Sequence, residues 1–193
     1  MRRALALSGG GSRAIVFHLG FLRRLAELGL LEQVTKLSTV SGGSIVVGMI
    51  YSHNDGRWPT SKEFLETVFP RLATIMTTTP LFSWWTVLTS PLHWLLFPFH
   101  RAYIVIWNLQ QRWGIRGKIA DLPELPEWTV NTTCYETGAN WRFSQRRMGD
   151  WKFGRREGVP YSIDEIIAAS AAVPYGLGTV DFKLPTGGWK FRS

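Results

Sequence analysis

The N-terminal part of the chain carries the clearest alternation of apolar and polar positions. Residues 4–7 form a short apolar run that stops at the glycine-rich stretch 8–12, which is typical of a buried strand ending in a tight loop. From Ala14 the apolar positions recur every three or four residues, which predicts an amphipathic helix up to Gly29. A second strand is expected at residues 36–40. Together these elements predict a βαβ unit of ~30 residues with parallel strands.

Both loops of this unit follow strands, so we expect them at the carboxyl edge of the sheet, where ligands of open α/β folds bind. In the first loop, three glycines at residues 9–11 open a helix and leave backbone N–H groups free for an anion. The second loop places Ser41 on a strand-to-helix turn, followed by Gly42 and Gly43. This resembles a nucleophile elbow, in which the positions two before and two after the serine must be small. Gly43 meets that requirement, whereas Thr39 stands where the usual motif has glycine.

Two neighbouring serines are weaker candidates for the nucleophile. Neither Ser38 nor Ser44 has a glycine two residues later, which the elbow requires. Ser41 is therefore the predicted nucleophile.

Three motifs, in this order, resemble those of the patatin-like phospholipases. The sequence GGGSR at residues 9–13 corresponds to the family's Gly-Gly-Gly-x-Arg-Gly, with Ala14 in place of the last glycine. The sequence SGG at residues 41–43 follows one βαβ unit later, and AASAAVP at residues 168–174 comes near the end. The resemblance spans nearly the whole chain.

The resemblance implies a fold and a reaction. The expected fold is a three-layer α/β/α patatin-like sandwich with a mainly parallel central sheet, incomplete at the C-terminus, in a single domain over residues 1–193. The implied activity is that of a lipid acyl hydrolase with a Ser–Asp dyad in which Ser41 is the nucleophile. One N–H donor to the oxyanion is typically worth ~3 kcal/mol of the barrier. The expected oxyanion hole comprises Gly9, Gly10, Gly11, Ser12 and Arg13. Arg13 either holds a lipid phosphate or pairs with a carboxylate.

The aspartate of such a dyad has no counterpart in the sequence. The family carries it in an Asp-Gly-Gly/Ala motif after the Ala-Ser-x-x-x-Pro helix, and no such motif follows Ser170. Asp55 precedes the required place, and Asp181 lies in an expected final strand without glycines. The family pattern would put the aspartate just past Ser193. We therefore expect this chain to be a truncated piece that is inactive or nearly so.

Histidine, cysteine and metal chemistry receive little support. The four histidines, at positions 18, 53, 93 and 100, have no orienting acid nearby in sequence, so a Ser-His-Asp triad is unsupported. Together with the single cysteine, Cys134, they give no metal-ligand spacing. We expect no metal and no cofactor.

An uncharged, aromatic segment interrupts the domain. Residues 72–100 contain no Asp, Glu, Lys or Arg and include many Trp and Phe side chains. The length could span a bilayer, but Pro80, Pro91 and Pro98 argue against one straight helix. We interpret residues 72–107 as a cap or membrane-interfacial segment; a transmembrane helix and a simple cover for the sheet are the alternatives.

Further elements are expected along the second half of the chain. Residues 60–63 predict a helix N-terminus, and residues 128–133 with 141–144 predict a hairpin. Ser162 opens a capping box and a helix up to residue 172. A final strand is expected at residues 180–184.

Composition adds information on location and partners. With 193 residues, 45% of them hydrophobic, the chain can bury one core, and a single cysteine suits a reducing, cytoplasmic compartment. A formal charge of +8 favours an anionic partner, although a solvated basic face is an equal alternative. The Arg and Lys cluster at residues 146–156 is better explained by a surface strand pair than by nucleic-acid binding, because no nucleic-acid-binding signature surrounds it. The expected partners are phospholipid or lysophospholipid and a membrane surface, with peripheral or membrane-associated localisation; the oligomeric state is left open.

Two other classes of function compete with the hydrolase. Gly9, Gly11 and Ala14 also fit a dinucleotide fingerprint, but the acid expected at the end of the second strand is absent and Ser41 would have no role. The apolar segment and the positive charge fit a catalytically inactive membrane-binding scaffold.

Overall fold

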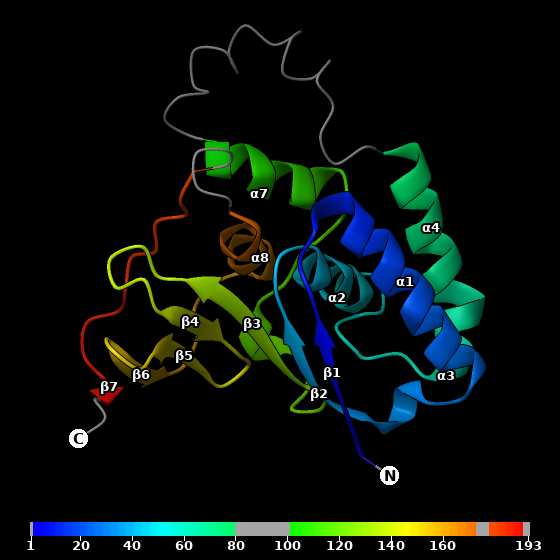
Figure 1. Cartoon of the computed structure of the whole chain (residues 1–193), viewed down its shortest axis with the longest axis horizontal. Coiled ribbons are helices and arrows are strands. Elements are labelled where there is room, and N and C mark those ends of the chain that lie inside the picture. Colours follow the sequence, from blue (N-terminus) through cyan, green and yellow to red (C-terminus); the bar gives the residue numbers. More distant parts are fainter. Residues whose placement is uncertain (1, 80–100, 173–177, 191–193) are drawn as a thin grey trace, which may run out of the picture.

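The computed structural model describes residues 2–79, 101–172 and 178–190 (Figure 1). The elements in chain order are β1 Arg3–Leu7, α1 Gly11–Glu27, η1 Leu31–Gln33, β2 Val34–Thr39, α2 Gly42–Ser52, α3 Ser61–Glu63, η2 Phe64–Val68, α4 Phe69–Thr78, α7 Arg101–Gln111, η3 Ile119–Asp121, β3 Glu127–Thr133, β4 Asn140–Phe143, β5 Arg147–Asp150, β6 Gly154–Glu157, α8 Ile163–Ala171 and β7 Trp189–Lys190. Most of the proposed cap segment, residues 80–100, lies outside the described residues. The described residues on either side of it, in α4 and α7, are helical.

The sheet contains seven strands in sequence order within the described part of the chain. β1, β2 and β3 are parallel, whereas β4 to β7 each run antiparallel to the strand before them. The predicted α/β class is confirmed, but the sheet is mixed where a mainly parallel one was predicted. The helices that contact the described sheet lie on one face, and Ala4, Ala6 and Ser38 on the opposite face are exposed.

The predicted βαβ unit is confirmed. β1 and β2 pair in parallel, with Leu5 opposite Leu37 and Leu7 opposite Thr39. The buried residues of α1 are Ala14, Ile15, His18, Leu19, Leu22 and Ala26, which follow the three- and four-residue spacing of the sequence. The helix begins at Gly11, three residues before the predicted start. The glycine loop is therefore partly the first turn of α1.

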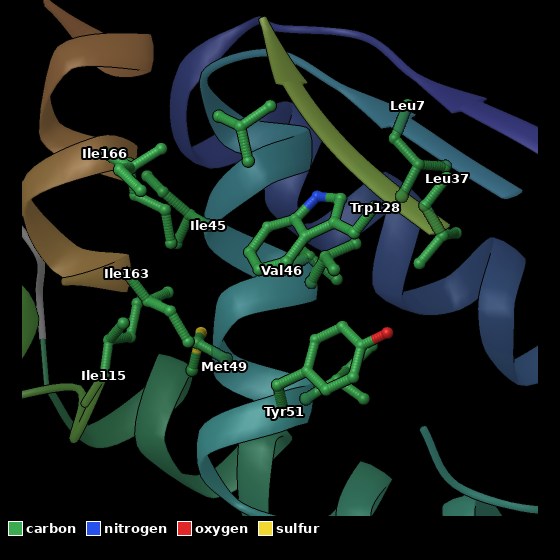
Figure 2. Close-up of a cluster of buried hydrophobic side chains, with 14 of the residues drawn as sticks. Leu7, Leu37, Ile45, Val46, Met49, Tyr51, Ile115, Trp128, Ile163 and Ile166 are labelled. Atoms are coloured by element: carbon green, nitrogen blue, oxygen red, sulfur yellow. The ribbon is translucent and has the colours of Figure 1, made fainter. Parts of the chain in front are cut away.

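Helix α2 lies between the sheet and the outer helices (Figures 1 and 2). Its residues from Gly42 to Tyr51 are all buried, as expected for a helix that is apolar on every side. The Trp128 ring of β3 stacks on the Tyr51 ring at 5.5 Å between centroids. On the other side Ile163 and Ile166 of α8 approach α2 in Figure 2. The core thus joins the sheet, α2 and α8, and so fixes the position of the helix that follows Ser41.

Local sequence signals outside the core are largely confirmed. Thr60 and Glu63 form a capping box at the start of α3, and Ser162 with Glu165 forms one at the start of α8. β3 and β4 form the predicted hairpin. Much of the basic cluster lies on the antiparallel pair β5 and β6, as predicted.

The predicted strand at residues 180–184 is wrong. These residues have no strand partner in the structure, and the last strand is β7 at Trp189–Lys190. The segment is held by side chains instead: the Phe182 ring packs against Tyr161 at 4.5 Å and Phe143 at 5.2 Å between centroids. The Tyr161 hydroxyl donates to the Lys183 carbonyl at 2.9 Å. The apolar spacing therefore reflects aromatic packing and not a backbone ladder.

Replacing Gly43 with alanine should destabilise the protein strongly. A Cβ atom on Gly43 would lie 2.5 Å from the Leu7 carbonyl oxygen, so β1 and α2 would have to move apart. We expect a loss of about 1–3 kcal/mol, the usual cost of overpacking, measured by urea unfolding.

Gly20 provides the matched control. It lies within α1, and a Cβ atom there would meet nothing within 4 Å. Gly20→Ala should therefore stabilise the protein by ~0.4–1 kcal/mol. Equal effects of the two substitutions would contradict the close approach of α2 to β1.

Candidate active site

Ser41 occupies a sharp turn between β2 and α2. Its backbone has φ 51° and ψ −118°, a left-handed φ that residues with a side chain rarely adopt. The Val40 N–H donates to the Leu7 carbonyl at 3.2 Å, and the Ile45 N–H donates to the Ser41 carbonyl at 3.0 Å. The chain thus leaves the sheet and enters the helix at one residue. Ser41 is partly exposed at this turn.

Glycines allow this turn to contact the first loop. A Cβ atom on Gly42 would lie 2.8 Å from the Gly11 carbonyl oxygen, so no side chain fits there. A Cβ atom on Gly9 would lie 3.1 Å from Ser41 Cβ and 3.7 Å from Ser41 Oγ. The structure therefore brings the glycine loop and the serine, predicted to be neighbours, into direct proximity.

The first loop ends in the N-terminus of α1. Gly10 has φ 140° and Gly11 has φ 62°, which explains why glycine is needed at both positions. Gly10 is the N-cap and has no side chain to cover the first N–H groups of the helix. The first turn contains no acidic residue, and Arg13 is exposed. This end of α1 therefore carries a partial positive charge suited to an anion.

A chain of hydrogen bonds between hydroxyl groups supports the turn from below. The Ser41 N–H donates to Ser170 Oγ of α8 at 2.9 Å, and the Ser170 hydroxyl donates to the Asn131 carbonyl at 2.7 Å. Ser44 Oγ lies 3.1 Å from Ser170 Oγ and 2.9 Å from Thr39 Oγ1. We call Thr39, Ser44 and Ser170 the hydroxyl chain. All three side chains are buried.

The direction of this chain follows from its two ends. The Ser170 hydroxyl donates its only proton to the Asn131 carbonyl, so in the contact with Ser44 it must accept and Ser44 must donate. Because the Ser44 proton is then committed, Thr39 must donate to Ser44. At the other end the Trp128 indole N–H donates to Thr39 Oγ1 at 2.9 Å. Every hydroxyl in the chain then has both a donor and an acceptor partner.

Thr39 is the residue that departs from the usual elbow motif, and the hydroxyl chain gives its role. Glycine there could not accept from Trp128 or donate to Ser44. Sequence reasoning identified Ser170 only as part of a motif and gave no role to Ser44 or Asn131. A run of small residues around Ser170 was the available signal, since it predicts that α8 approaches the active-site loops closely.

No base for Ser41 is found in the described part of the chain. There, no hydrogen bond joins Ser41 Oγ to a carboxylate or an imidazole. His18 is 4% exposed and donates through Nε2 to the Ser8 carbonyl at 2.9 Å, so it anchors the glycine loop. His53 donates to the Trp113 carbonyl at 2.8 Å, beyond the far end of α2. The remaining two histidines, at positions 93 and 100, lie outside the described residues.

The acidic residues considered from the sequence lie elsewhere. Asp55 occupies a positive-φ turn after the end of α2, and Asp181 is exposed. Asp164 is buried, and its burial raises the pKa of the carboxyl above its usual value; Gln110 donates to it at 2.7 Å. Asp164 is in the first turn of α8, whereas Ser170 is in the last, so this carboxyl belongs to the helix start and not to the serine site.

The described residues contain no group of three or more His, Cys, Asp or Glu side chains placed to hold a metal ion. No helix among them combines the length and apolarity needed to cross a membrane.

The fold and this site define an α/β protein with a serine elbow facing a glycine loop at a helix N-terminus. The Patatin-like phospholipase family matches residues 5–187. The chain belongs to the patatin-like phospholipase family.

Individual relatives agree with this assignment. A segment of 47 residues is 49% identical to cytosolic phospholipase A2 gamma of Mus musculus, covering 24% of this chain and 8% of that protein. Two structures of human GIVD cytosolic phospholipase A2, with bound methyl gamma-linolenyl fluorophosphonate, are similar in fold. They give TM-scores of 0.61 and 0.60 at 21% and 20% identity, over 91% and 86% of this chain. The chain spans only 30% and 28% of those two chains.

Removing the Ser170 hydroxyl should destabilise the elbow. Ser170→Ala leaves the Ser41 N–H without its acceptor and Ser44 without one partner, both at partly or fully buried positions. Unsatisfied buried groups cost about 1–3 kcal/mol each, so we expect a loss of that order in the free energy of urea unfolding.

Ser52→Ala is the comparison for this variant. The Ser52 hydroxyl also makes two hydrogen bonds, with the backbone of Arg116, but at an exposed position where water can replace it. Its loss should cost less than about 1 kcal/mol. A Ser170→Ala protein as stable as Ser52→Ala would show that the hydroxyl chain contributes little.

Proposed function

We propose that this chain carries the nucleophile and oxyanion-binding part of a lipid acyl hydrolase of the phospholipase A or lysophospholipase type. The observation that carries the proposal is the position of Ser41 at a positive-φ turn, next to the glycine loop. A Cβ atom placed on Gly9 of that loop would lie 3.7 Å from Ser41 Oγ. A hydroxyl at the tip of such a turn can reach a carbonyl carbon while nearby amides face the carbonyl oxygen.

The proposed reaction begins with attack of Ser41 Oγ on the acyl carbonyl. The serine proton passes to a base, and the carbonyl oxygen becomes an oxyanion held by the backbone N–H groups at Gly10 and Gly11. Collapse of this intermediate breaks the C–O ester bond, and the alcohol leaves with the proton. Water then hydrolyses the acyl-serine and restores the free hydroxyl.

The base in this proposal is the aspartate of a Ser–Asp dyad from outside these 193 residues. The absence of a carboxylate bonded to Ser41 Oγ in the described residues is in keeping with this assignment. The 193-residue chain alone should then be inactive or nearly so, and activity belongs to a protein that supplies the aspartate.

Exposed apolar side chains suggest where an acyl chain would lie. Val40 precedes Ser41 and is 38% exposed, and Val16 and Phe17, in the second turn of α1, are 61% and 69% exposed. Large apolar groups on the surface near a candidate site favour an apolar ligand. Together with the family, they support phospholipid or lysophospholipid as the substrate.

Arg13 is the proposed contact for the lipid phosphate. It is exposed, lies in the first turn of α1 and has no carboxylate within ion-pair distance among the described residues. Of the two roles considered for Arg13, this favours the phosphate contact.

A catalytically inactive membrane-binding scaffold is the second candidate, because no base is joined to Ser41 in the described residues. Peripheral membrane association, a cytoplasmic location and a cap role for residues 72–107 are parts of either proposal.

Ser41→Ala should abolish covalent labelling by a fluorophosphonate probe and hydrolysis of phospholipid by the protein that contains the aspartate. Loss of a catalytic serine costs on the order of 10⁴ to 10⁶ in rate. Mass spectrometry of the labelled peptide gives the site, and fatty-acid release gives the rate. Ser52→Ala, at the other end of α2, should keep both.

The outcomes separate the two candidates. Ester turnover that survives Ser41→Ala would remove the hydrolase proposal. Vesicle binding by the whole protein without labelling at Ser41 would support the scaffold.

Arg13→Gln should raise KM for a phospholipid roughly tenfold or more, because a charge-assisted hydrogen bond is worth ~1.5–3 kcal/mol. Hydrolysis of an uncharged ester of the same acyl chain should change little. Equal effects on both substrates would mean that Arg13 serves the structure of the loop and not the phosphate.

A further inference from the structure

Three exposed aromatic side chains gather on two neighbouring turns. Tyr135 is 80% exposed in the turn between β3 and β4, and Trp151 and Phe153 are 66% and 40% exposed in the turn between β5 and β6. We call residues 134–139 and 151–153 the aromatic turns. Several large exposed aromatic side chains on adjoining turns mark an interaction surface more often than a single one does.

The aromatic turns lie at the same edge of the sheet as Ser41. β1, β2 and β3 are parallel, so the chain after β3 emerges at the carboxyl edge, where Ser41 follows β2. β4 reverses the direction and β5 reverses it again, so the chain after β5 emerges at this edge too. Figure 1 shows the two turns at one side of the sheet, after β3 and between β5 and β6.

Hydrogen bonds through Asp150 and Lys152 join the two turns to each other. Asp150, 3% exposed, accepts from the Thr137 hydroxyl at 2.9 Å and from the Lys152 N–H at 2.8 Å. The Lys152 ammonium donates to the Thr137 carbonyl at 2.7 Å, and the Phe153 ring packs edge-on against Trp189 at 5.0 Å. The buried carboxylate of Asp150 thus fixes the backbone of the turns that present the exposed rings. Such support is expected of a surface that binds something.

Positive charge lies beside the rings. A hollow of about 340 Å³ next to Trp151 is lined by Arg147, Asp150, Trp151, Gly154, Arg155, Arg156, Glu157 and Lys190. Two of its four cations are already ion-paired, Lys190 with Glu157 at 3.6 Å and Arg147 with Glu127 at 3.9 Å, and Asp150 is bonded within the turns. Arg155 and Arg156 then remain without a carboxylate partner among the described residues, so the hollow keeps an excess of positive charge. Arg155 of β6 lies opposite Lys190 of β7 in the strand register, and both side chains are exposed. The hollow is therefore suited to an anionic group.

We propose that the aromatic turns and this cationic hollow form a docking surface for an anionic phospholipid membrane. The rings enter the headgroup boundary, where Trp and Tyr are favoured, and the Arg and Lys side chains contact lipid phosphates. Docking in this way turns the edge of the sheet that carries Ser41 toward the lipid; this part of the inference rests on the proposed hydrolase function. Nucleic acid is the other polyanion that cations with aromatics can bind. The exposed side chain of Val40, next to Ser41 at the same edge of the sheet, favours lipid.

The test is cosedimentation of the whole protein, in a Ser41→Ala background, with phosphatidylcholine vesicles with and without phosphatidylglycerol. The background prevents hydrolysis, so binding is read separately from activity. We expect binding to the mixed vesicles that weakens with salt. The double variant Tyr135→Ser/Trp151→Ser should bind the mixed vesicles at least about tenfold more weakly than the parent protein. Arg155→Gln/Lys190→Gln should lose roughly tenfold on mixed vesicles only.

Leu28→Ser provides the matched control. Leu28 is a 53% exposed apolar residue at the C-terminal end of α1, toward the opposite edge of the sheet, so its loss should leave vesicle binding unchanged. Thermal unfolding of each variant shows that the fold is kept. Vesicle binding equal in all variants, or absent in the parent protein, would overturn the proposal. A labelled oligonucleotide that binds and is lost with the same variants, without vesicle binding, would overturn it in favour of nucleic acid.

The two proposals fail in different ways. If the docking proposal is correct and the hydrolase proposal is not, vesicle binding falls in the docking-surface variants. The protein with Ser41 intact then shows no fluorophosphonate label at that residue. If the hydrolase proposal is correct and the docking proposal is not, the docking-surface variants with Ser41 intact keep full vesicle binding and full turnover of vesicle lipid. If both hold, turnover of vesicle lipid falls with the variants while turnover of a soluble short-chain ester stays at the parent level.

Discussion

The candidate site depends on the strained backbone of one residue. A left-handed φ at a residue with a side chain costs of the order of 1–3 kcal/mol, and Ser41 has φ 51°. The conformation persists because contacts on both sides leave no alternative. Gly43 packs against the Leu7 carbonyl, and the Ser41 N–H is held by Ser170. The hydroxyl is therefore presented to solvent by the packing of α2 and α8 against the sheet.

The hydroxyl chain links this strain to the core. Ser170 belongs to α8, Ser44 to α2 and Thr39 to β2, so the three elements that meet below the serine are also joined by hydrogen bonds. Trp128, which closes the chain through its indole N–H, is fully buried and stacked on Tyr51 of α2. A polar group in a core is costly unless it is bonded, so a chain that is completely satisfied favours one arrangement of these elements over slipped ones. The hydroxyl chain thus both positions Ser41 and stabilises the packing of α2 and α8 against the sheet.

Much of this could be predicted from local patterns. The βαβ unit, the glycine loop, the serine turn and both capping boxes each depend on residues close in sequence. The hydroxyl chain could not, because its bonds join residues 129 and 126 positions apart, and nothing in the sequence states which small polar residues of α8 face the elbow. The missed end of the sheet has a similar cause. An alternating pattern around Phe182 predicts a strand, but ring packing against Tyr161 satisfies the same pattern without strand pairing.

The replacement of glycine by Thr39 illustrates how a motif can depart from its family and keep its geometry. The elbow requires space near the serine, and Thr39 supplies it by pointing into the core, where it is 1% exposed, away from the solvent side of the turn. Its hydroxyl would be unsatisfied there without partners. Trp128 and Ser44 provide both, so the departure is compensated by two residues that a glycine would not need. A threonine at this position is therefore tolerated only together with a donor from β3 and an acceptor from α2, and the three residues form one unit of the site.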